Sequence, residues 1–233
     1  DLGSALMTHE GAWRFGIFAG VFALLALWQS LRPYRGVRAR GRRWGRHLII
    51  ALLGSLLVRL LFPVAAVAVG AWAENARFGL LQQLPLPPWL VIASSIVLLD
   101  LAIYWQHRIF HWLPPLWRLH RMHHSDTQFD VSTAIRFHPL EIALSMLIKI
   151  GVVALVGAPA VAVILFEIVL NATAMFNHSD VHLPAGLDAR LRWWLVTPDM
   201  HRIHHSTERV ETDSNFGFCL PWWDRLFGSY RHR

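Results

Sequence analysis

Apolar residues in this chain come in runs that are long enough to cross a lipid bilayer. Residues 13–31, 47–72, 89–105 and 142–177 consist largely of Leu, Ile, Val, Ala and aromatic residues. A helix of about 20 such residues covers the roughly 30 Å of hydrocarbon in a membrane. Only 16% of the 233 residues are charged, whereas a soluble domain has about 25%. The sequence therefore predicts an all-α integral membrane helix bundle and argues against a soluble enzyme.

We expect about five membrane-embedded helices in a single membrane domain, residues 1–233. Three N-terminal spans occupy 13–105, and a histidine-rich region with two further spans occupies 106–233. The three N-terminal spans are predicted over Trp13–Leu31, over His47–Trp72 with Arg59 and Pro63 inside it, and over Trp89–Trp105.

The histidine-rich region contains a predicted helical hairpin over residues 141–177. Gly157-Ala158-Pro159 interrupts the apolar stretch, and Gly and Pro favour a turn at that point. Lys149 lies eight residues before Gly157, and Glu167 lies eight residues after Pro159. The two charges therefore reach a similar depth and are expected to pair, which would offset the high cost of either one alone in lipid. We interpret this pair as structural, with a catalytic role as the alternative.

A cluster of arginines gives the expected orientation. Residues 32–46 contain seven Arg, and a short loop of this kind is retained on the cytoplasmic side. Alternation of the spans then places 32–46, 106–141 and 178–233, including the C-terminus, on the cytoplasmic side of a membrane of the bacterial inner type. There they would form a histidine-rich helical cap. The basic excess is thus a topology signal, and we expect no nucleic-acid partner.

Histidine is the chemically informative residue of the chain. The single cysteine, Cys219, excludes an intramolecular disulfide and any site that needs several thiolates. Ten of the 14 histidines cluster where apolar spans end, and these are His107, His111, His120, His123, His124, His178, His182, His201, His204 and His205. HxxxH and HxxHH spacings place imidazoles within a turn of one another on a helix. A row of histidines that contacts lipid headgroups is the weaker interpretation, because headgroup binding would use Arg or Lys.

The number of clustered histidines indicates two neighbouring metal sites. Ten imidazoles exceed the four ligands of one tetrahedral zinc, whereas two metals with about five nitrogens each use the whole set. Imidazole suits iron, copper, nickel and zinc, so the ligand type alone does not choose the metal. The segments HRMHHS and HRIHHS, which start at residues 120 and 201, agree at five of six positions. They are predicted to form two halves of one dinuclear site.

The order HxxxH, HxxHH, HxxxH, HxxHH resembles the fatty acid hydroxylase superfamily, also called the sterol desaturase family, whose members are membrane non-haem di-iron oxygenases. The similarity covers about residues 95–230. It includes FNHS at 176–179, which contains His178, and three segments without a predicted metal ligand: RFHPLE at 136–141, DSNFG at 213–217 and WDRLFG at 223–228. The resemblance implies that the ten histidines bind two iron ions and that O2 is the co-substrate. It also implies two electrons from a separate donor of the cytochrome or ferredoxin type with its reductase. Zinc is a possible substitute for iron in purified protein.

Three further residues are candidates for contacts around the metal ligands. His138 could donate a hydrogen bond to a ligand or cap the next helix. Asp100 could orient a ligand histidine or pair with Arg59. Asn215 is the remaining candidate for a polar contact near the metals.

The other polar residues near the motifs carry weaker expectations. Carboxylates often fix the tautomer of a ligating imidazole, and we expect about half of Asp126, Asp180, Asp199 and Asp213 to do so. His9, His47 and His232 are expected to be solvated. Removal of His182 should harm the site least, because helical geometry is expected to end before it.

The function expected on these grounds is O2-dependent hydroxylation of a C–H bond in a membrane lipid, which is a fatty acyl, sterol-like or related apolar substrate, by a His-ligated di-iron centre. A desaturase on the same scaffold is one alternative, because abstraction of the first hydrogen is shared. A non-catalytic membrane scaffold that metal stabilises is another. The substrate, the oxidised carbon and the electron donor leave no readable mark, because a lipid pocket is lined by the same apolar residues as any core.

Overall fold

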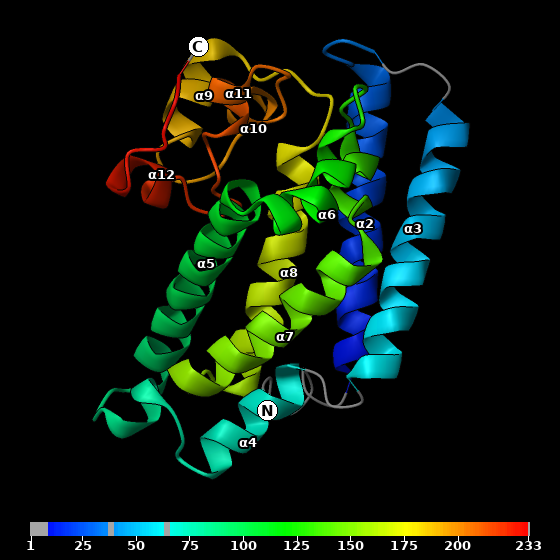
Figure 1. Cartoon of the computed structure of the whole chain (residues 1–233). Coiled ribbons are helices and arrows are strands. Elements are labelled where there is room, and N and C mark those ends of the chain that lie inside the picture. The colour runs from blue at the N-terminus through cyan, green and yellow to red at the C-terminus, as the bar shows by residue number, and fades with distance from the viewer. Residues whose placement is uncertain (1–8, 37–39, 63–65, 233) are drawn as a thin grey trace.

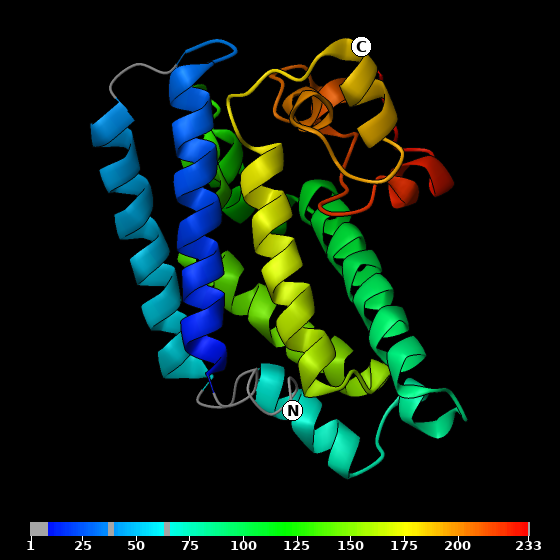
Figure 2. The same cartoon turned by 180° about the vertical axis from the view of Figure 1, so that it is seen from behind.

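The long helices of the fold coincide with the apolar runs. The computed structural model describes residues 9–36, 40–62 and 66–232, and its long helices are α2 (Glu10–Leu31), α3 (Arg40–Leu61), α5 (Pro88–Trp112), α7 (Pro139–Val156) and α8 (Ala160–Asn177). Each overlaps one of five stretches that are long and apolar enough to span a membrane, the first of which begins at Gly11. They stand side by side as a bundle (Figures 1 and 2). The predicted all-α membrane bundle is confirmed.

The outer faces of these helices are apolar. Leu24 on α2, Leu60 on α3 and Leu155 on α7 are each at least 65% exposed. Side chains of this kind are unfavourable in water and favourable against lipid. The bundle therefore has the surface of a membrane protein.

The second span differs from the prediction of His47–Trp72. Helix α3 begins at Arg40, and the end of the predicted span belongs to a separate short helix, α4 (Ala66–Asn75), which lies across the end of the bundle opposite α6 (Figure 1). Arginine is a good helix former, so the basic segment extends the helix. Pro63, which was predicted inside the span, lies outside the described residues. The third span is also longer than predicted, since α5 continues from Trp105 to Trp112.

The predicted hairpin is confirmed. Gly157 ends α7 with a φ of +73°, a conformation that favours glycine, and a Cβ there would lie 2.7 Å from the carbonyl oxygen of Phe78. Lys149 and Glu167 pair as expected, with 2.6 Å between Nζ and Oε1. Arg14 on α2 lies 2.6 Å from the other carboxylate oxygen of Glu167. The hairpin is thus tied to α2 as well as closed on itself.

The predicted polar stretches meet at one end of the bundle. This end contains α6 (Pro114–His124), η2 (Val131–Ile135), α9 (Ala185–Leu191), α10 (Pro198–His204), α11 (Arg209–Thr212) and α12 (Trp222–Leu226), while α4 and η1 (Leu80–Gln83) lie at the other end. The backbone N–H of Tyr34 donates to the carbonyl of Asp180 at 2.9 Å. The Asp180 carboxylate accepts from the N–H groups of Arg35 and Gly36. The expectation that these stretches share one side of the bundle is therefore confirmed.

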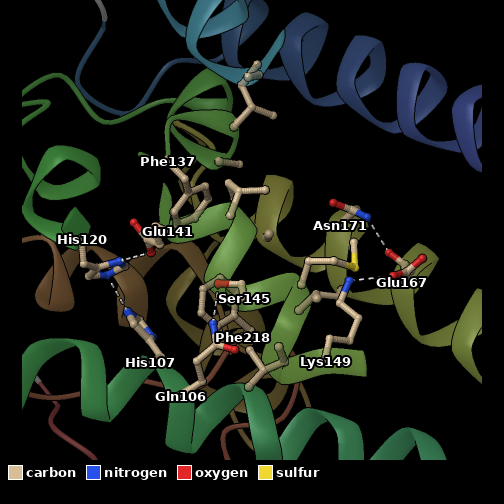
Figure 3. Close-up of a pocket in the computed structure, with 18 of the residues that line it drawn as sticks. Gln106, His107, His120, Phe137, Glu141, Ser145, Lys149, Glu167, Asn171 and Phe218 are labelled. Atoms are coloured by element: carbon tan, nitrogen blue, oxygen red, sulfur yellow. Dashed lines mark hydrogen bonds and ion pairs between the residues drawn. The ribbon is translucent and has the colours of Figure 1, made fainter. Parts of the chain in front are cut away.

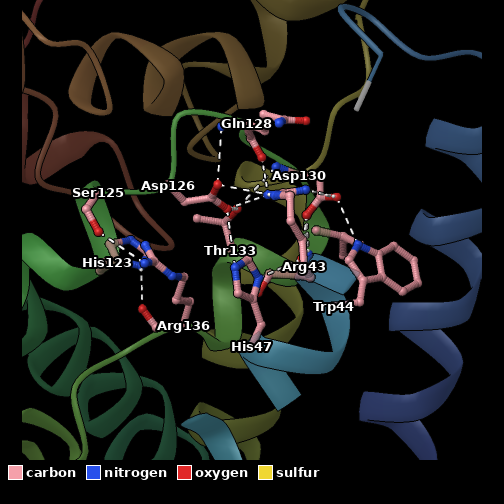
Figure 4. A network of polar contacts seen from close by, with 12 residues as sticks. Arg43, Trp44, His47, His123, Ser125, Asp126, Gln128, Asp130, Thr133 and Arg136 are labelled. Atoms are coloured by element: carbon pink, nitrogen blue, oxygen red, sulfur yellow. Dashed lines mark hydrogen bonds and ion pairs between the residues drawn. The ribbon is translucent and has the colours of Figure 1, made fainter. Parts of the chain in front are cut away.

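A buried ion network joins α3 to the segment between α6 and α7 (Figure 4). Arg43 contacts Asp126 and lies 3.0 Å from Asp130. His47, one turn along α3, lies 2.8 Å from the hydroxyl of Ser132 and is only 4% exposed. The expectation that His47 is solvated is wrong, because Arg43 brings this end of α3 onto two carboxylates. Part of the arginine cluster is therefore structural.

Candidate metal centre

The long α5 helix begins the centre. His107 and His111 lie on its last two turns, and His111 is one residue before its end at Trp112. Leu113-Pro114-Pro115 then turns the chain into α6, because proline at the start of a helix is favoured and cannot continue the helix before it. Helix α6 carries His120, His123 and His124 over the end of α5.

Nine of the ten predicted ligands converge in two groups. Site 1 consists of His107, His111, His120, His124 and His204, and site 2 of His123, His178, His201 and His205. Within each site one nitrogen from every histidine lies within 4.8 Å of the others. The rings of His124 and His205 stack at 4.3 Å between centroids, so the two sites adjoin.

Each HxxHH motif contributes to both sites. On α6, His120 and His124 belong to site 1, while His123 belongs to site 2. On and just after α10 the division is reversed, because His201 and His205 belong to site 2 and His204 to site 1. Residues four apart share a helix face, and the residue between them points to the neighbouring face. The repeated motif thus supplies six of the nine histidines and links the two sites.

Five of the nine histidines direct Nδ1 at an oxygen acceptor. His107 Nδ1 lies 2.8 Å from the carbonyl oxygen of Phe216, and His204 Nδ1 lies 2.8 Å from that of Ser214. In the same way, His178 contacts Ala174 O at 2.7 Å, His123 contacts Arg136 O at 3.3 Å and His120 contacts Glu141 Oε1 at 2.6 Å. Since carbonyl and carboxylate oxygens only accept, each of these Nδ1 atoms donates a hydrogen. In a neutral imidazole, Nε2 then carries a bare lone pair.

These bare nitrogens face one another. The Nε2 atoms of His107 and His120 lie 3.1 Å apart, and those of His123 and His178 lie 3.0 Å apart. Neither partner of these pairs has a hydrogen to share, so no hydrogen bond satisfies them. His204 Nε2 is also buried without a hydrogen-bond partner among the described residues. Clustered lone pairs of this kind fit metal ions and are unfavourable without a cation.

Burial keeps the histidines neutral. His201 and His204 are fully buried, and desolvation lowers the pKa of each well below the usual range. Desolvation likewise lowers the pKa of His123 well below the usual range and that of His178 to about 4. The neutral form is the one that binds metal, so near pH 7 these imidazoles need lose no proton to act as ligands.

His182 is not brought to either site. Helix α8 ends at Asn177, so the four-residue spacing from His178 to His182 does not place the two side chains on one face. The His182 side chain is exposed, and its ring stacks on Tyr34 at 5.1 Å between centroids. The expected loss of helical geometry before His182 is confirmed.

Two of the three additional candidates, His138 and Asp100, contact groups other than the histidines of the two sites. His138 is the N-cap of α7 and accepts from the N–H of Leu140 at 3.2 Å, which is the capping alternative. Asp100 neither orients a histidine nor pairs with Arg59. Its carboxylate accepts from the indole of Trp223 at 2.8 Å and from two backbone N–H groups of the C-terminal segment. Asp100 therefore anchors that segment on α5.

Asn215 acts through its neighbours. Its side chain donates to the carbonyls of Met200 and Arg231 at 3.1 and 3.0 Å, and its φ is +50°. The flanking carbonyls of Ser214 and Phe216 are the acceptors for His204 and His107. Asn215 thus holds a bend that presents two acceptors to site 1, although its own side chain contacts neither of these histidines.

Two carboxylates contact site 1, and only one of them belongs to the four aspartates considered in the sequence. Of the four aspartates considered, Asp213 lies 3.4 Å from His111 Nδ1, and this contact lowers the pKa of Asp213. Asp126, Asp180 and Asp199 pair with arginines or backbone groups instead. The expectation that about half contact a ligand is too high. The carboxylate closest to a histidine of site 1 is that of Glu141, which contacts His120. In the sequence, only its place in the RFHPLE segment marks this residue.

A cavity of about 370 Å³ leads into the bundle from site 1. It lies among α2, α3, α5, α7 and α8, and it extends from His107 and His120 to Lys149 and Glu167 (Figure 3). Phe18, Ile103 and Leu170 are among the apolar residues of its wall. Because the cavity lies among membrane-length helices, an apolar molecule can reach site 1 through it.

A second, larger groove of about 800 Å³ also reaches the centre. His124 and His205 lie on its wall. Four arginines also line it, namely Arg35, Arg118, Arg121 and Arg202. The centre can therefore be reached through an apolar route and through a basic one.

The sequence matches the family model described as fatty acid hydroxylase over residues 92–229. This region covers more than half of the chain and all ten predicted ligands. The chain belongs to the fatty acid hydroxylase family. No solved structure matches it significantly.

Relatives within this family are lipid oxidoreductases. The ornithine lipid hydroxylase OlsE of Rhizobium tropici is 27% identical over 231 residues, which cover 94% of this chain and 67% of the relative. The human alkylglycerol monooxygenase is 32% identical over 61% of this chain, and the match covers 31% of that protein. The Delta(7)-sterol 5(6)-desaturase erg3C of Aspergillus fumigatus is 28% identical over 62% of this chain and half of the relative.

Proposed function

We propose that this chain is an O2-dependent lipid hydroxylase whose two histidine sites hold two iron ions. The observation that carries the proposal is that the Nε2 lone pairs of His107 and His120 face each other at 3.1 Å and those of His123 and His178 at 3.0 Å, while the Nδ1 atom of each of the four donates to an oxygen acceptor. Iron accepts imidazole ligands, and the family and its relatives are hydroxylases, monooxygenases and desaturases. The two irons would activate O2 so that one oxygen atom enters a C–H bond and the other leaves as water.

In this proposal the chain's own residues position the substrate and exclude water. The cavity beside His107 and His120 holds a lipid that enters sideways from the bilayer. Phe110 and Phe218 stand on its wall near the ligands, so apolar side chains surround the reacting carbon. Holding one C–H bond in place beside the metals decides which carbon is oxidised.

The reaction balances with two electrons, which a separate protein would supply, and two protons from water. The basic groove beside His124 and His205 favours an acidic partner of the cytochrome or ferredoxin type, because opposite charges steer association. Arg118 and Arg121 are exposed on this groove.

We also propose that the histidine end of the bundle faces the cytoplasm. The described arginines of residues 32–46, which are all of them except Arg38, lie at this end, and such loops remain inside. A reporter fused after Arg233 should then be active in the cytoplasm of a bacterial host. An external C-terminus would contradict this orientation.

The function is tested with iron-loaded protein, a chemical reductant and a bacterial lipid extract under ¹⁸O-labelled O2. The proposal predicts a lipid that has gained one labelled oxygen atom. A product that has lost two hydrogens without gaining oxygen would identify a desaturase, as one relative is. Bound metal without O2 consumption would favour a metal-stabilised scaffold.

A further inference from the structure

The cavity wall carries a polar stripe along α7. Glu141, Ser145 and Lys149 follow one another at intervals of four residues and all line the cavity, because that spacing puts them on one helix face. Glu141 contacts His120 of site 1. Lys149 lies about 12 Å further along the helix at a rise of 1.5 Å per residue. The cavity therefore has an ammonium at a fixed distance from the metal ligands.

Lys149 retains unused hydrogen-bond donors. Its ammonium has three N–H groups, and in the described part of the chain it donates one hydrogen bond, to Glu167 Oε1 at 2.6 Å. The Lys149 side chain is 15% exposed and the Glu167 side chain 4%, so the carboxylate is covered while the ammonium borders the cavity (Figure 3). Ionisable groups at such depth are costly and commonly mark a binding or transport path.

A second polar atom on the wall also lacks a partner. Gln106 Nε2 donates to Ser145 Oγ at 2.8 Å, but Gln106 Oε1 is buried without a hydrogen-bond partner among the described residues. A pure hydrocarbon in this cavity would cover these donor and acceptor groups without satisfying them, and each such group costs free energy. An oxygen atom on the occupant can accept from Lys149, and a hydroxyl group can also donate to an acceptor such as Gln106 Oε1.

We propose that Lys149 is a substrate-binding residue that donates a hydrogen bond to an oxygen atom of the lipid, in a hydroxyl, ether or carbonyl group. Glu167 holds the ammonium in place. The separation along α7 between Lys149 and Glu141, whose carboxylate contacts His120, then sets the distance between that oxygen and the carbon that is oxidised. The inference rests on the proposed function for the reaction but concerns binding, which requires neither metal nor electrons.

The competing interpretation is that the ion pair only fastens α7 to α8. Two substitutions separate the interpretations. The double variant K149M/E167Q removes both charges and the ammonium donors while keeping side chains of similar length. The matched control K149R keeps the ion pair and the N–H donors.

The experiment measures binding of 1-octadecanol and of octadecane to the purified full-length protein in detergent, by displacement of a fluorescent fatty probe. Wild-type protein and K149R should bind the alcohol about tenfold more tightly than the hydrocarbon, which corresponds to about 1.4 kcal/mol. K149M/E167Q should bind the two probes equally. Thermal unfolding of each variant reports the structural role separately.

Equal binding of the two probes by wild-type protein overturns the proposal without any variant. A preference that survives in folded K149M/E167Q also overturns it. If the Lys149-dependent preference is present but iron-loaded protein oxidises no lipid, the proposed function fails and the binding role stands. If lipid oxidation occurs without the Lys149-dependent preference, the binding role fails and the proposed function stands.

Discussion

Loss of the Glu141 carboxylate should weaken metal binding at site 1. Glu141 Oε1 accepts from His120 Nδ1 at 2.6 Å, and both side chains are at least 95% buried. The substitution Glu141→Leu leaves this Nδ1 hydrogen without its acceptor and removes a negative charge beside the bound cations. Removal of such an outer partner typically lowers metal affinity about 10- to 100-fold, which corresponds to about 1.4–2.7 kcal/mol. Competition with a chelator measures the affinity.

The matched control for this variant is His138→Ala. His138 starts the same helix, but its ring caps the N–H of Leu140 and contacts no ligand. We expect a loss of about 1 kcal/mol of stability from the missing cap with unchanged metal affinity. The reasoning is refuted if Glu141→Leu leaves the affinity unchanged. It is also refuted if His138→Ala lowers the affinity equally, because the effect would then come from the position of α7.

Three further predictions concern the ligands, the groove and pH. His204→Ala should lose metal and turnover, whereas His182→Ala should keep the metal content of wild type by elemental analysis, because only His204 lies in a site. The pair Arg118→Glu and Arg121→Glu should slow association with an acidic electron donor about tenfold or more at low salt, with less effect at high salt, in stopped-flow measurements. Metal-free protein should lose stability as pH falls from about 6.5 toward 4, measured by thermal unfolding. In this pH range the histidines of the unfolded chain bind protons, whereas the same histidines in the folded protein stay neutral because burial lowers their pKa values. Stability that does not change over that range would contradict this.

Features that depend on local spacing could be predicted from the sequence. Helical periodicity places the histidines of each HxxHH motif within about one turn, and the structure brings all six of them together with three other predicted ligands. The turn at Gly157 and the pairing of Lys149 with Glu167 depend on the hairpin alone. The spacing within one motif concerns a single helix and its end, and the turn and the ion pair concern two consecutive helices.

Features that depend on distant segments could not be predicted in the same way. Asp100 anchors Trp223, more than 120 residues away, and no spacing rule connects them. His47 is buried because Arg43 pairs with carboxylates between α6 and α7. The acceptors for His107 and His204 are backbone carbonyls, which every residue has, so the sequence carries no signal for them.

The central claim is that the chain holds two metals. The most direct test is the metal content per chain of protein expressed in iron-supplemented medium and purified without chelators. The account predicts two irons per chain, or two metals in total if zinc has replaced iron. One metal or none per folded chain would contradict the double site and remove the basis for the proposed oxygenase.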